Sequence, residues 1–284
     1  MGYAAKILKD SVTTDGARLT TFEVTIPRIV LAEFNTHRML SRNSASSRAI
    51  PVERRIAAVE SDPFVPEAFG RNQKGMQAAE ELADQDAADA RAAWMFAATD
   101  ACRHARRLAG IGVHKQLANR LLEPFLWHTV IASATEWDNF FALRDNAAAQ
   151  PEIAKPVRLM RAALAESEPS RLRFGQWHTP FVDFDEAASL AAAGFSADEI
   201  LLVSVGRCAR VSYLTHDGIR DPRADVDLAL RLRSSGHMSP FEHVAQAYAL
   251  DLAHELVGNF RGWKQYRKTI RNEHNFALVA GGAP

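Results

Sequence analysis

Alternating apolar and polar positions mark a strand near the start of the chain. Residues 19–27 read Leu-Thr-Thr-Phe-Glu-Val-Thr-Ile-Pro and are rich in the β-branched residues that favour strands. The pattern predicts a strand over this segment that has run into a helix by Leu31. Pro27 is expected in the first helical turn, where its missing N–H costs nothing. A looser alternation over Val244–Leu252 predicts another strand.

Helical periodicity predicts most of the remaining elements. The longest helix is expected over Gln77–Leu108, an alanine-rich segment with Gly110 as its stop. Its buried side is expected to carry Leu82, Trp94, Met95, Ala98 and Cys102. Ser196, with Glu199 three residues later, forms a capping-box pattern that begins a helix reaching Tyr213. Further helices are expected over Glu136–Arg144, Ile153–Ala165, Asp225–Ser235 and Leu256–Ile270.

Proline, glycine and small polar residues predict irregular structure in three places. Pro51–Lys74 is expected to be irregular, Ser167–Phe181 to be a loop or flap, and Asn35–Ser47 to be an active-site loop. Since no low-complexity linker divides the chain, residues 1–284 are expected to form a single domain.

Composition narrows the class of protein. The 284 residues are 47% hydrophobic and 24% charged, as in soluble globular proteins. Lys plus Arg equals Asp plus Glu, 34 each, and this balance argues against a protein that coats nucleic acid. No apolar run is long enough to cross a membrane, no signal peptide is evident, and two cysteines make no disulfide framework. A reduced, cytoplasmic setting is expected.

The densest polar segment is Asn35–Arg48, Asn-Thr-His-Arg-Met-Leu-Ser-Arg-Asn-Ser-Ala-Ser-Ser-Arg. Arginine supplies bidentate donors for phosphate, and small serines let backbone N–H groups approach an anion. A polar surface loop explains the same composition equally well. No glycine-rich phosphate loop is present, so a flavin would not bind through a Rossmann fingerprint.

Three further segments contain candidate functional residues. Gly236–His243 contains Ser-Pro-x-Glu, which is also a plain helix start, and its two histidines lack a zinc-site spacing, so no metal is expected. Arg120 begins the segment Arg-Leu-Leu-Glu-Pro, and Arg144 follows the apolar run Phe140–Leu143, where an arginine is more often a helix-end cation or a salt-bridge partner. Cys208 is better interpreted as a buried structural cysteine than as a nucleophile.

Together these segments resemble the flavin-dependent thymidylate synthases. That family's signature is Arg-His-Arg-x-x-Ser-x-Asn-x-x-Ser-x-Arg, and here Thr36-His37-Arg38 is followed at matching spacings by Ser41, Asn43, Ser46 and Arg48. Three other family segments recur at Ala209–Tyr213, Gly236–His243 and Asn139–Arg144, the last followed by Ala149-Gln150. Because the first two normally precede the signature, the chain resembles a circularly permuted member. Arg261–Arg267 resembles a degenerate second copy of the signature helix.

The resemblance implies that residues 1–284 form a single catalytic domain of the α+β class, with a twisted antiparallel sheet and long helices. It implies a homotetramer with composite sites between subunits. Residues of about 52–115 and 155–205 carry little resemblance and are expected to be variable. It implies that FAD, NADPH and 5,10-methylenetetrahydrofolate serve the reductive methylation of dUMP to dTMP. Two alternatives stay open. One is hydroxymethylation or another alkylation at carbon 5 of a related pyrimidine nucleotide, and the other is a non-catalytic nucleotide-binding relative.

The resemblance also assigns residues. Flavin contacts are expected from His37, Arg38, Met39, Asn139, His237, Ser239 and Glu242. Nucleotide contacts are expected from Glu33, Ser44, Ala45, Ser46, Ser47, Arg48, Arg120 and Arg144. Arg48 and Arg120 suit the phosphate. Arg144 would stabilise charge on the activated uracil, and Ser46 would lie near the ring without acting as a nucleophile.

Three departures from the family pattern affect this site. Thr36 replaces the first arginine of the signature, Glu33 replaces a glutamine and Ser44 replaces a glutamate. An anionic Glu33 near a phosphate is unfavourable unless a cation neutralises it. The missing donors are expected from the C-terminal segment, through Arg261, Gln265 or Arg267.

Overall fold

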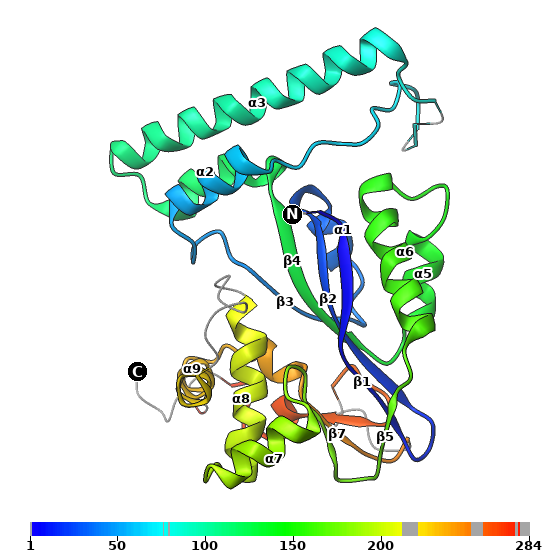
Figure 1. Cartoon of the computed structure of the whole chain (residues 1–284), viewed down its shortest axis with the longest axis vertical. Coiled ribbons are helices and arrows are strands. Elements are labelled where there is room, and N and C mark those ends of the chain that lie inside the picture. Colours follow the sequence, from blue (N-terminus) through cyan, green and yellow to red (C-terminus); the bar gives the residue numbers. More distant parts are fainter. Residues whose placement is uncertain are drawn as a thin grey trace.

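A five-stranded sheet forms the centre of the computed structural model, which describes residues 2–75, 77–78, 80–211, 221–250, 258–275 and 278 (Figure 1). Its strand order is β3-β4-β2-β1-β5. The strands are β1 (Ala4–Thr13), β2 (Arg18–Pro27), β3 (Ser41–Ser44), β4 (Trp127–Ala134) and β5 (Ser170–Leu172). Only the short β1–β5 pair is parallel. The mixture of this sheet with long helices confirms the predicted α+β class.

The central strand β2 is buried because both of its faces are covered. Phe22, Val24 and Ile26 alternate onto one face and join a hydrophobic core with helices α5 (Asp138–Arg144) and α6 (Pro151–Glu166). The predicted strand over 19–27 is confirmed. Pro27 belongs to that strand, paired with Trp127, and the helical turns η1 (Arg28–Val30) and α1 (Leu31–Asn35) follow it.

A chain of buried polar side chains joins the other face of β2 to a smaller sheet. This second sheet contains β6 (Trp177–His178), β7 (Ala245–Ala247) and β8 (Trp263–Gln265). Thr21 Oγ1 lies 2.6 Å from Ser133 Oγ and 2.9 Å from His178 Nε2. His243 Nδ1 lies 2.8 Å from Ser133 Oγ, and Ser11 Oγ lies 3.0 Å from His178 Nδ1.

Both histidines of this chain are neutral. Burial lowers the pKa of His243 to about 3, and burial together with the charge of Lys9 lowers the pKa of His178 well below its usual value. A neutral ring can both donate and accept, so it can link hydroxyl groups in a dry interior. The two sheets are therefore held together by hydrogen bonds as well as by apolar packing.

Three helices cover the smaller sheet: α7 (Phe184–Ala192), α8 (Ala197–Arg210) and α9 (Pro222–Ser234). The predicted capping box of Ser196 and Glu199 is present at the start of α8. Helices α8 and α9 approach closely at Gly206, where an added Cβ would lie 2.3 Å from the carbonyl oxygen of Asp225. Gly236, with φ of +72°, ends the chain's run through α9 and directs it toward η4 (Ser239–Glu242).

A third layer lies beyond the end of the sheet, with α3 on the outside of the molecule (Figure 1). It contains α2 (Val52–Ser61), α3 (Asp84–Gly110), α4 (Lys115–Ala118) and η2 (Asn119–Phe125). Its own hydrophobic cluster includes Ile56, Val59, Ala98, Cys102 and Leu122. This layer is connected to the edge of the sheet where β3 lies, so it can position the polar segment that follows β3.

Several predicted elements were wrong. Pro51–Lys74 is not irregular throughout, because Pro51 is the N-cap of α2 and Ile56 and Val59 form its buried face. Helix α3 begins at Asp84 instead of Gln77, and Met95 is 41% exposed instead of buried. The predicted helix Leu256–Ile270 is replaced, in its described part, by β8 and by η5 (Tyr266–Thr269).

The predicted helix Leu256–Ile270 was wrong because two glycines in this segment have positive φ angles. Gly258 and Gly262 adopt φ of +77° and +71°, which do not continue a right-handed helix. The expected strand over Val244–Leu252 is confirmed as the shorter β7, and the expected loop Ser167–Phe181 contains the short strands β5 and β6. Tyr213, Leu252 and Leu256 lie outside the described residues.

Candidate functional site

The polar segment after Asn35 forms the edge strand β3 and the turn that follows it. Alternation along this segment buries Ala45 and Ser47 and leaves Ser44, Ser46 and Arg48 on the open side. Strand geometry accounts for the alternation within β3, which ends at Ser44, because successive side chains point to opposite faces. The predicted active-site loop is therefore a strand up to Ser44 and an irregular segment with a turn after it.

The presented side chains line a cavity of about 450 Å³. Its walls come from three segments that are far apart in sequence: the β3 segment, the turn before α4, and the region from α8 to η4. The lining residues are Asn43, Ser44, Ser46, Arg48, Ala49, His114, Gln116, Ala209, Leu232, His237, Ser239 and Pro240. Small-molecule sites in proteins commonly range over roughly 300–1,000 Å³, so the cavity has room for a nucleotide-sized ligand.

Asn43 connects the walls of this cavity. Its Nδ2 donates to the carbonyl oxygen of Cys208 at 2.7 Å, and its Oδ1 accepts from Ser239 Oγ at 3.5 Å. Cys208 is fully buried, and burial raises the pKa of its thiol, so the thiolate needed for nucleophilic attack is disfavoured. This environment supports the structural interpretation of Cys208.

Glu123 of η2 lies beneath the loop. Its Oε1 accepts hydrogen bonds from Ser47 Oγ, from Arg28 at 3.2 Å and from Arg120 at 2.9 Å. Burial raises the pKa of Glu123, but the bond from Ser47 and the two arginines outweigh burial and lower it overall. Asn119 supports the same loop by donating to the carbonyl oxygens of Ser47 and Ile50. Ser47 and Arg120 thus support the loop from behind.

A second polar cluster surrounds Arg144, which does not line the cavity. Arg144 Nε donates to His37 Nε2 at 2.8 Å, and its Nη2 donates to Thr36 Oγ1 at 3.2 Å. Burial and the charges of Arg144 and Arg42 lower the pKa of His37, so its ring is neutral and accepts from Arg144. The ring of His37 packs edge-on against Phe140 at 4.8 Å. The guanidinium is therefore held in one orientation.

Glu33 lies beside this cluster. Its backbone oxygen accepts from Thr36 Oγ1 at 2.7 Å, and its carboxylate oxygen Oε2 is buried without a hydrogen-bond partner among the described residues. Arg38 and Met39, which follow Glu33 in the sequence, are exposed, and so is Asn139 of α5. A buried carboxylate oxygen that lacks a donor is costly to leave unpaired, and a ligand donor would satisfy it.

The C-terminal segment reaches the signature segment through Gln265. Gln265 Nε2 donates to Ser41 Oγ at 3.0 Å and to Asn259 Oδ1 at 2.8 Å. Arg267 instead pairs with Glu242 and Glu273, each at 2.6 Å. Arg261 pairs with Glu136 at 3.2 Å. The two arginines have carboxylate partners of their own, so a role in offsetting Glu33 stays a prediction.

The structure thus divides the sequence-predicted residues. It brings Ser44, Ser46, Arg48, His237 and Ser239 together on the cavity, and it gathers Glu33, His37 and Arg144 in the second cluster. Glu242 lies at the Arg267 ion pair. Sequence reasoning missed His114, Gln116 and Glu123. His114 lies at the end of the variable region and Gln116 just after it, whereas Glu123 lies in the same Arg-Leu-Leu-Glu-Pro segment as Arg120 and its carboxylate was the available signal.

The described part of the chain contains neither a cluster of metal ligands nor a helix that could span a membrane. No three His, Cys, Asp or Glu side chains there lie close enough together to hold a metal ion. No helix among the described residues is both long and apolar enough to span a membrane.

Comparison with known proteins identifies the family. The family described as "Thymidylate synthase complementing protein" matches residues 18–170, more than half of the chain. No curated protein matches. Among solved structures, the UMP/dUMP methylase PolB from Streptomyces cacaoi bound with 5-Br dUMP is 17% identical, with a TM-score of 0.47 over 58% of this chain and 91% of that one. The same protein bound with 5-Br UMP is 16% identical, with a TM-score of 0.47 over 58% of this chain and 89% of that one. As its sequence motifs predicted, the chain belongs to the thymidylate synthase complementing protein family.

Proposed function

We propose that this protein is a flavin-dependent enzyme that reductively methylates dUMP at carbon 5 to form dTMP. The observation that carries the proposal is the cavity, because two family motifs far apart in the sequence line it together. Ser44, Ser46 and Arg48 come from one motif, and His237 and Ser239 come from the other. That these two motifs meet in one cavity supports the arrangement that the proposed chemistry needs.

The nucleotide is proposed to bind along Ser44–Arg48. Arg48 is exposed, has no ion pair with a described residue, and offers a bidentate donor to the phosphate. The backbone N–H of Arg48 donates to Ser46 Oγ at 3.3 Å, which leaves the Ser46 hydroxyl hydrogen to donate to the ligand. Ala45 and Ser47 set the loop geometry from the buried side, with Arg120 acting through Glu123.

Arg144 is proposed to act on the uracil ring of a nucleotide bound in the cavity of a neighbouring subunit. Within one chain Arg144 does not line the cavity, and the family resemblance implies a homotetramer with composite sites. Its guanidinium is already oriented by His37 and Thr36. Such a group stabilises developing negative charge on the ring without having to reorganise during the reaction.

The residues present fit a flavin. His237 and Ser239 offer polar contacts on the cavity wall, and the exposed Arg38 offers a cation to a diphosphate. Met39, 49% exposed, offers apolar surface, and the unpaired Glu33 oxygen accepts a donor. Asn139 and Glu242 complete the proposed set. Bound FAD, reduced by NADPH, would supply the reducing equivalents for a one-carbon unit from 5,10-methylenetetrahydrofolate.

Two measurements test this proposal. Titration of FAD into the apoprotein is expected to quench flavin fluorescence. Incubation with dUMP labelled with tritium at carbon 5, NADPH and 5,10-methylenetetrahydrofolate is expected to release tritium to water. Nucleotide binding without flavin binding or tritium release would overturn the proposal in favour of the non-catalytic alternative.

Mass spectrometry of the product separates the remaining alternatives. A methyl product from dUMP supports the proposal as stated. A hydroxymethyl product, or turnover of a different pyrimidine nucleotide only, would show that Thr36, Glu33 and Ser44 have changed the reaction on the same scaffold.

A further inference from the structure

Helix α3 is the most exposed large element of the molecule. Only one side of it is covered, where Ala98, Cys102 and Ala105 pack in the hydrophobic cluster with α2 and η2. The opposite side faces outward along all 27 residues, about 40 Å at 1.5 Å per residue. At its middle Phe96 is 73% exposed. A helix of this length with an aromatic side chain in water at its centre has an unpartnered face.

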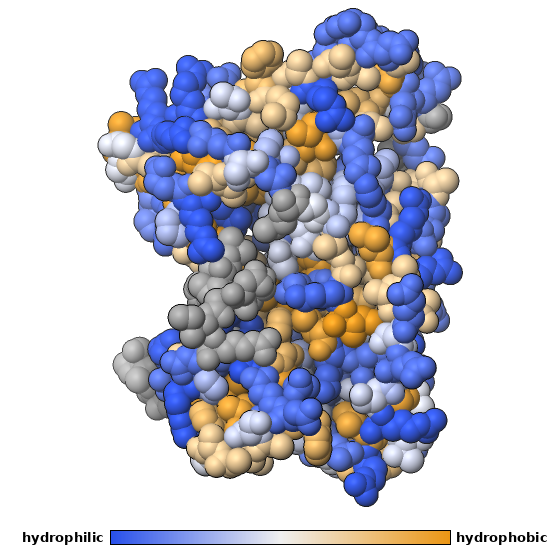
Figure 2. Space-filling model, in the orientation of Figure 1, coloured by the Kyte–Doolittle hydropathy of each residue, from blue (hydrophilic) through white to orange (hydrophobic). Residues whose placement is uncertain are grey.

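The outward face has the pattern of a helix-pairing surface. Its residues follow one another at intervals of four and three, which places them on a single stripe. They are Gln85, Asp89, Ala92, Phe96, Asp100, Arg103 and Arg107, and all are exposed. Ala92 and Ala93 before Phe96, and Ala97 after it, leave room for a second helix to approach closely. Along this upper edge, Figure 2 shows apolar residues in the middle and hydrophilic residues toward both ends.

The charges on α3 are divided between its two halves. The first half carries three aspartates, Asp84, Asp86 and Asp89, and one arginine. That arginine, Arg91, is directed to the subunit's own backbone, where it donates to the carbonyl oxygen of Pro66 at 3.2 Å. The second half carries three arginines and one aspartate: Arg103, Arg106, Arg107 and Asp100. An identical helix would therefore be repelled in parallel orientation and attracted in antiparallel orientation.

We infer that α3 pairs with α3 of a second copy of this chain, antiparallel, about a two-fold axis at Phe96. In this register residue 89 of each copy faces residue 103 of the other, so Asp89 meets Arg103. Arg106 lies to the side of the stripe and pairs with Glu60 of its own subunit at 2.6 Å, so Asp89–Arg103 is the ion pair across this contact. The two Phe96 rings pack against the alanines at the centre. Such a contact is self-complementary, as two-fold interfaces require.

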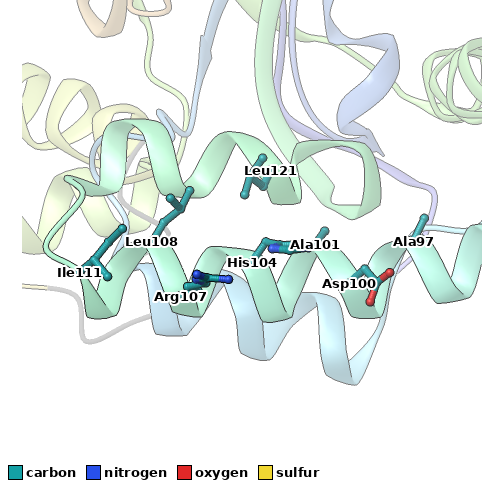
Figure 3. Close-up of a pocket in the computed structure, with 8 residues that line it drawn as sticks. All are labelled: Ala97, Asp100, Ala101, His104, Arg107, Leu108, Ile111 and Leu121. Carbon is teal, nitrogen blue, oxygen red and sulfur yellow. The ribbon is translucent and has the colours of Figure 1, made fainter.

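A groove beside the stripe widens this surface. It has a volume of about 640 Å³ and lies between the second half of α3 and Leu121 of η2 (Figure 3). Its outer end carries Ile111, which is 71% exposed, and Leu121 is 40% exposed. In the antiparallel pair the first half of the partner's α3 covers this groove. The pairing does not depend on the chemistry proposed for the cavity.

Disulfide trapping tests the axis. In a Phe96→Cys variant the two introduced thiols meet at the two-fold axis, whereas Cys102 and Cys208 are buried and do not compete. Mild oxidation is expected to convert most of the protein to a covalent dimer on a non-reducing gel. Phe184→Cys on α7 is the matched control, because Phe184 is 84% exposed, and it is expected to give little dimer. Equal trapping of the two variants, or none for Phe96→Cys, overturns the inference.

Charge exchange tests the orientation. Asp89→Arg places arginines opposite each other twice in the interface, and sedimentation is expected to show self-association weakened at least about 30-fold. Adding Arg103→Asp to the same chain restores opposite charges and is expected to recover most of the association. Asp185→Arg on α7 is the control and is expected to leave association unchanged. An unaffected Asp89→Arg variant, or a double variant as weak as the single one, overturns the antiparallel register.

Discussion

Two polar clusters at neighbouring positions of this molecule are built from the same kinds of side chain and differ in almost everything else. Ser11, Thr21, Ser133, His178 and His243 are fully buried and bonded to one another. The serines of the β3 segment, with Arg48 and His237, instead line an open cavity. The difference teaches that burial and hydrogen bonds within the interior mark a structural polar group, although His243 Nε2 has no partner among the described residues, and that presentation to a cavity marks a candidate functional one.

The buried histidines are expected to lower the free energy of unfolding as the pH falls. This is the largest of the effects predicted here. The pKa of His243 is about 3 in the folded protein and near 6.5 in the unfolded chain, and the pKa of His178 is also lowered. The unfolded state therefore binds more protons below pH 6.5. Stability is full above that pH and is lost toward pH 3, by up to about 1.4 kcal/mol per pH unit per histidine.

Urea unfolding at pH 7, 6, 5 and 4.5 checks this expectation. A His243→Gln variant serves as the control, since its stability is expected to fall less steeply between pH 6 and 4.5. If the free energy of unfolding of the parent protein stays constant over this range, the buried histidines are not neutral.

Arg144→Ala is expected to lower kcat about 10²- to 10³-fold and to leave the fold intact. An oriented cation that acts on developing charge contributes several kcal/mol, mostly in the transition state. Tritium release from labelled dUMP measures the rate, and thermal unfolding checks the fold. Arg144→Lys keeps the charge but loses the two fixed bonds and is expected to recover only part of the rate. Unchanged turnover in Arg144→Ala would remove this residue from the site.

The same substitution at Ser133 and at Ser46 tests the comparison directly. Ser133→Ala removes the partner of His243 Nδ1 in a dry interior and is expected to cost about 1–3 kcal/mol of stability. Ser46→Ala is expected to change stability by less than about 0.5 kcal/mol, as surface substitutions do, and to weaken nucleotide binding. Chemical denaturation and nucleotide titration measure the two quantities. Equal stability losses would contradict the division between structural and functional serines.

Alanine substitutions at Arg48 and Arg120 are expected to change the Kd for dUMP by different amounts, and this is the smallest of the predicted effects. Arg48→Ala removes a cation that faces the cavity and is expected to raise the Kd for dUMP about tenfold, or about 1.4 kcal/mol. Arg120→Ala is expected to raise it less than about threefold, because Arg120 is paired with Glu123 behind the loop. Isothermal titration at two salt concentrations measures both. The reverse order would place the phosphate on the η2 side.

Prediction from the sequence succeeded where a local rule decides the structure. The strand over 19–27 follows from its alternation, and the start of α8 follows from Ser196 and Glu199. It failed where the same residue type can either begin or interrupt a helix. Pro51 was interpreted as a helix breaker and is a helix start, whereas Gly258 and Gly262 interrupt what reads as a continuous basic helix.

For the candidate site, motif spacing predicts candidate residues but not their separation in space. Ser46 and His237 share one cavity, whereas Arg144 lies with His37 in another cluster. No spacing in a single sequence states whether two motifs meet within one chain or between two. Glu123 was missed because a carboxylate beside a proposed phosphate site looks unfavourable until its buried partners, Ser47 and Arg28, are known.

The close contact between α8 and α9 at Gly206 affects the position of the cavity wall. The backbones of α8 and α9 touch there so closely that even a methyl group would collide with the carbonyl oxygen of Asp225. Any larger residue would push α9 outward, and α9 ends directly before His237 on the cavity wall. Because residue 206 has no side chain, α8 and α9 can pack this closely. Their spacing in turn sets the width of the cavity. A redesign of the cavity width can therefore act at Gly206, which is not among the residues that line the cavity.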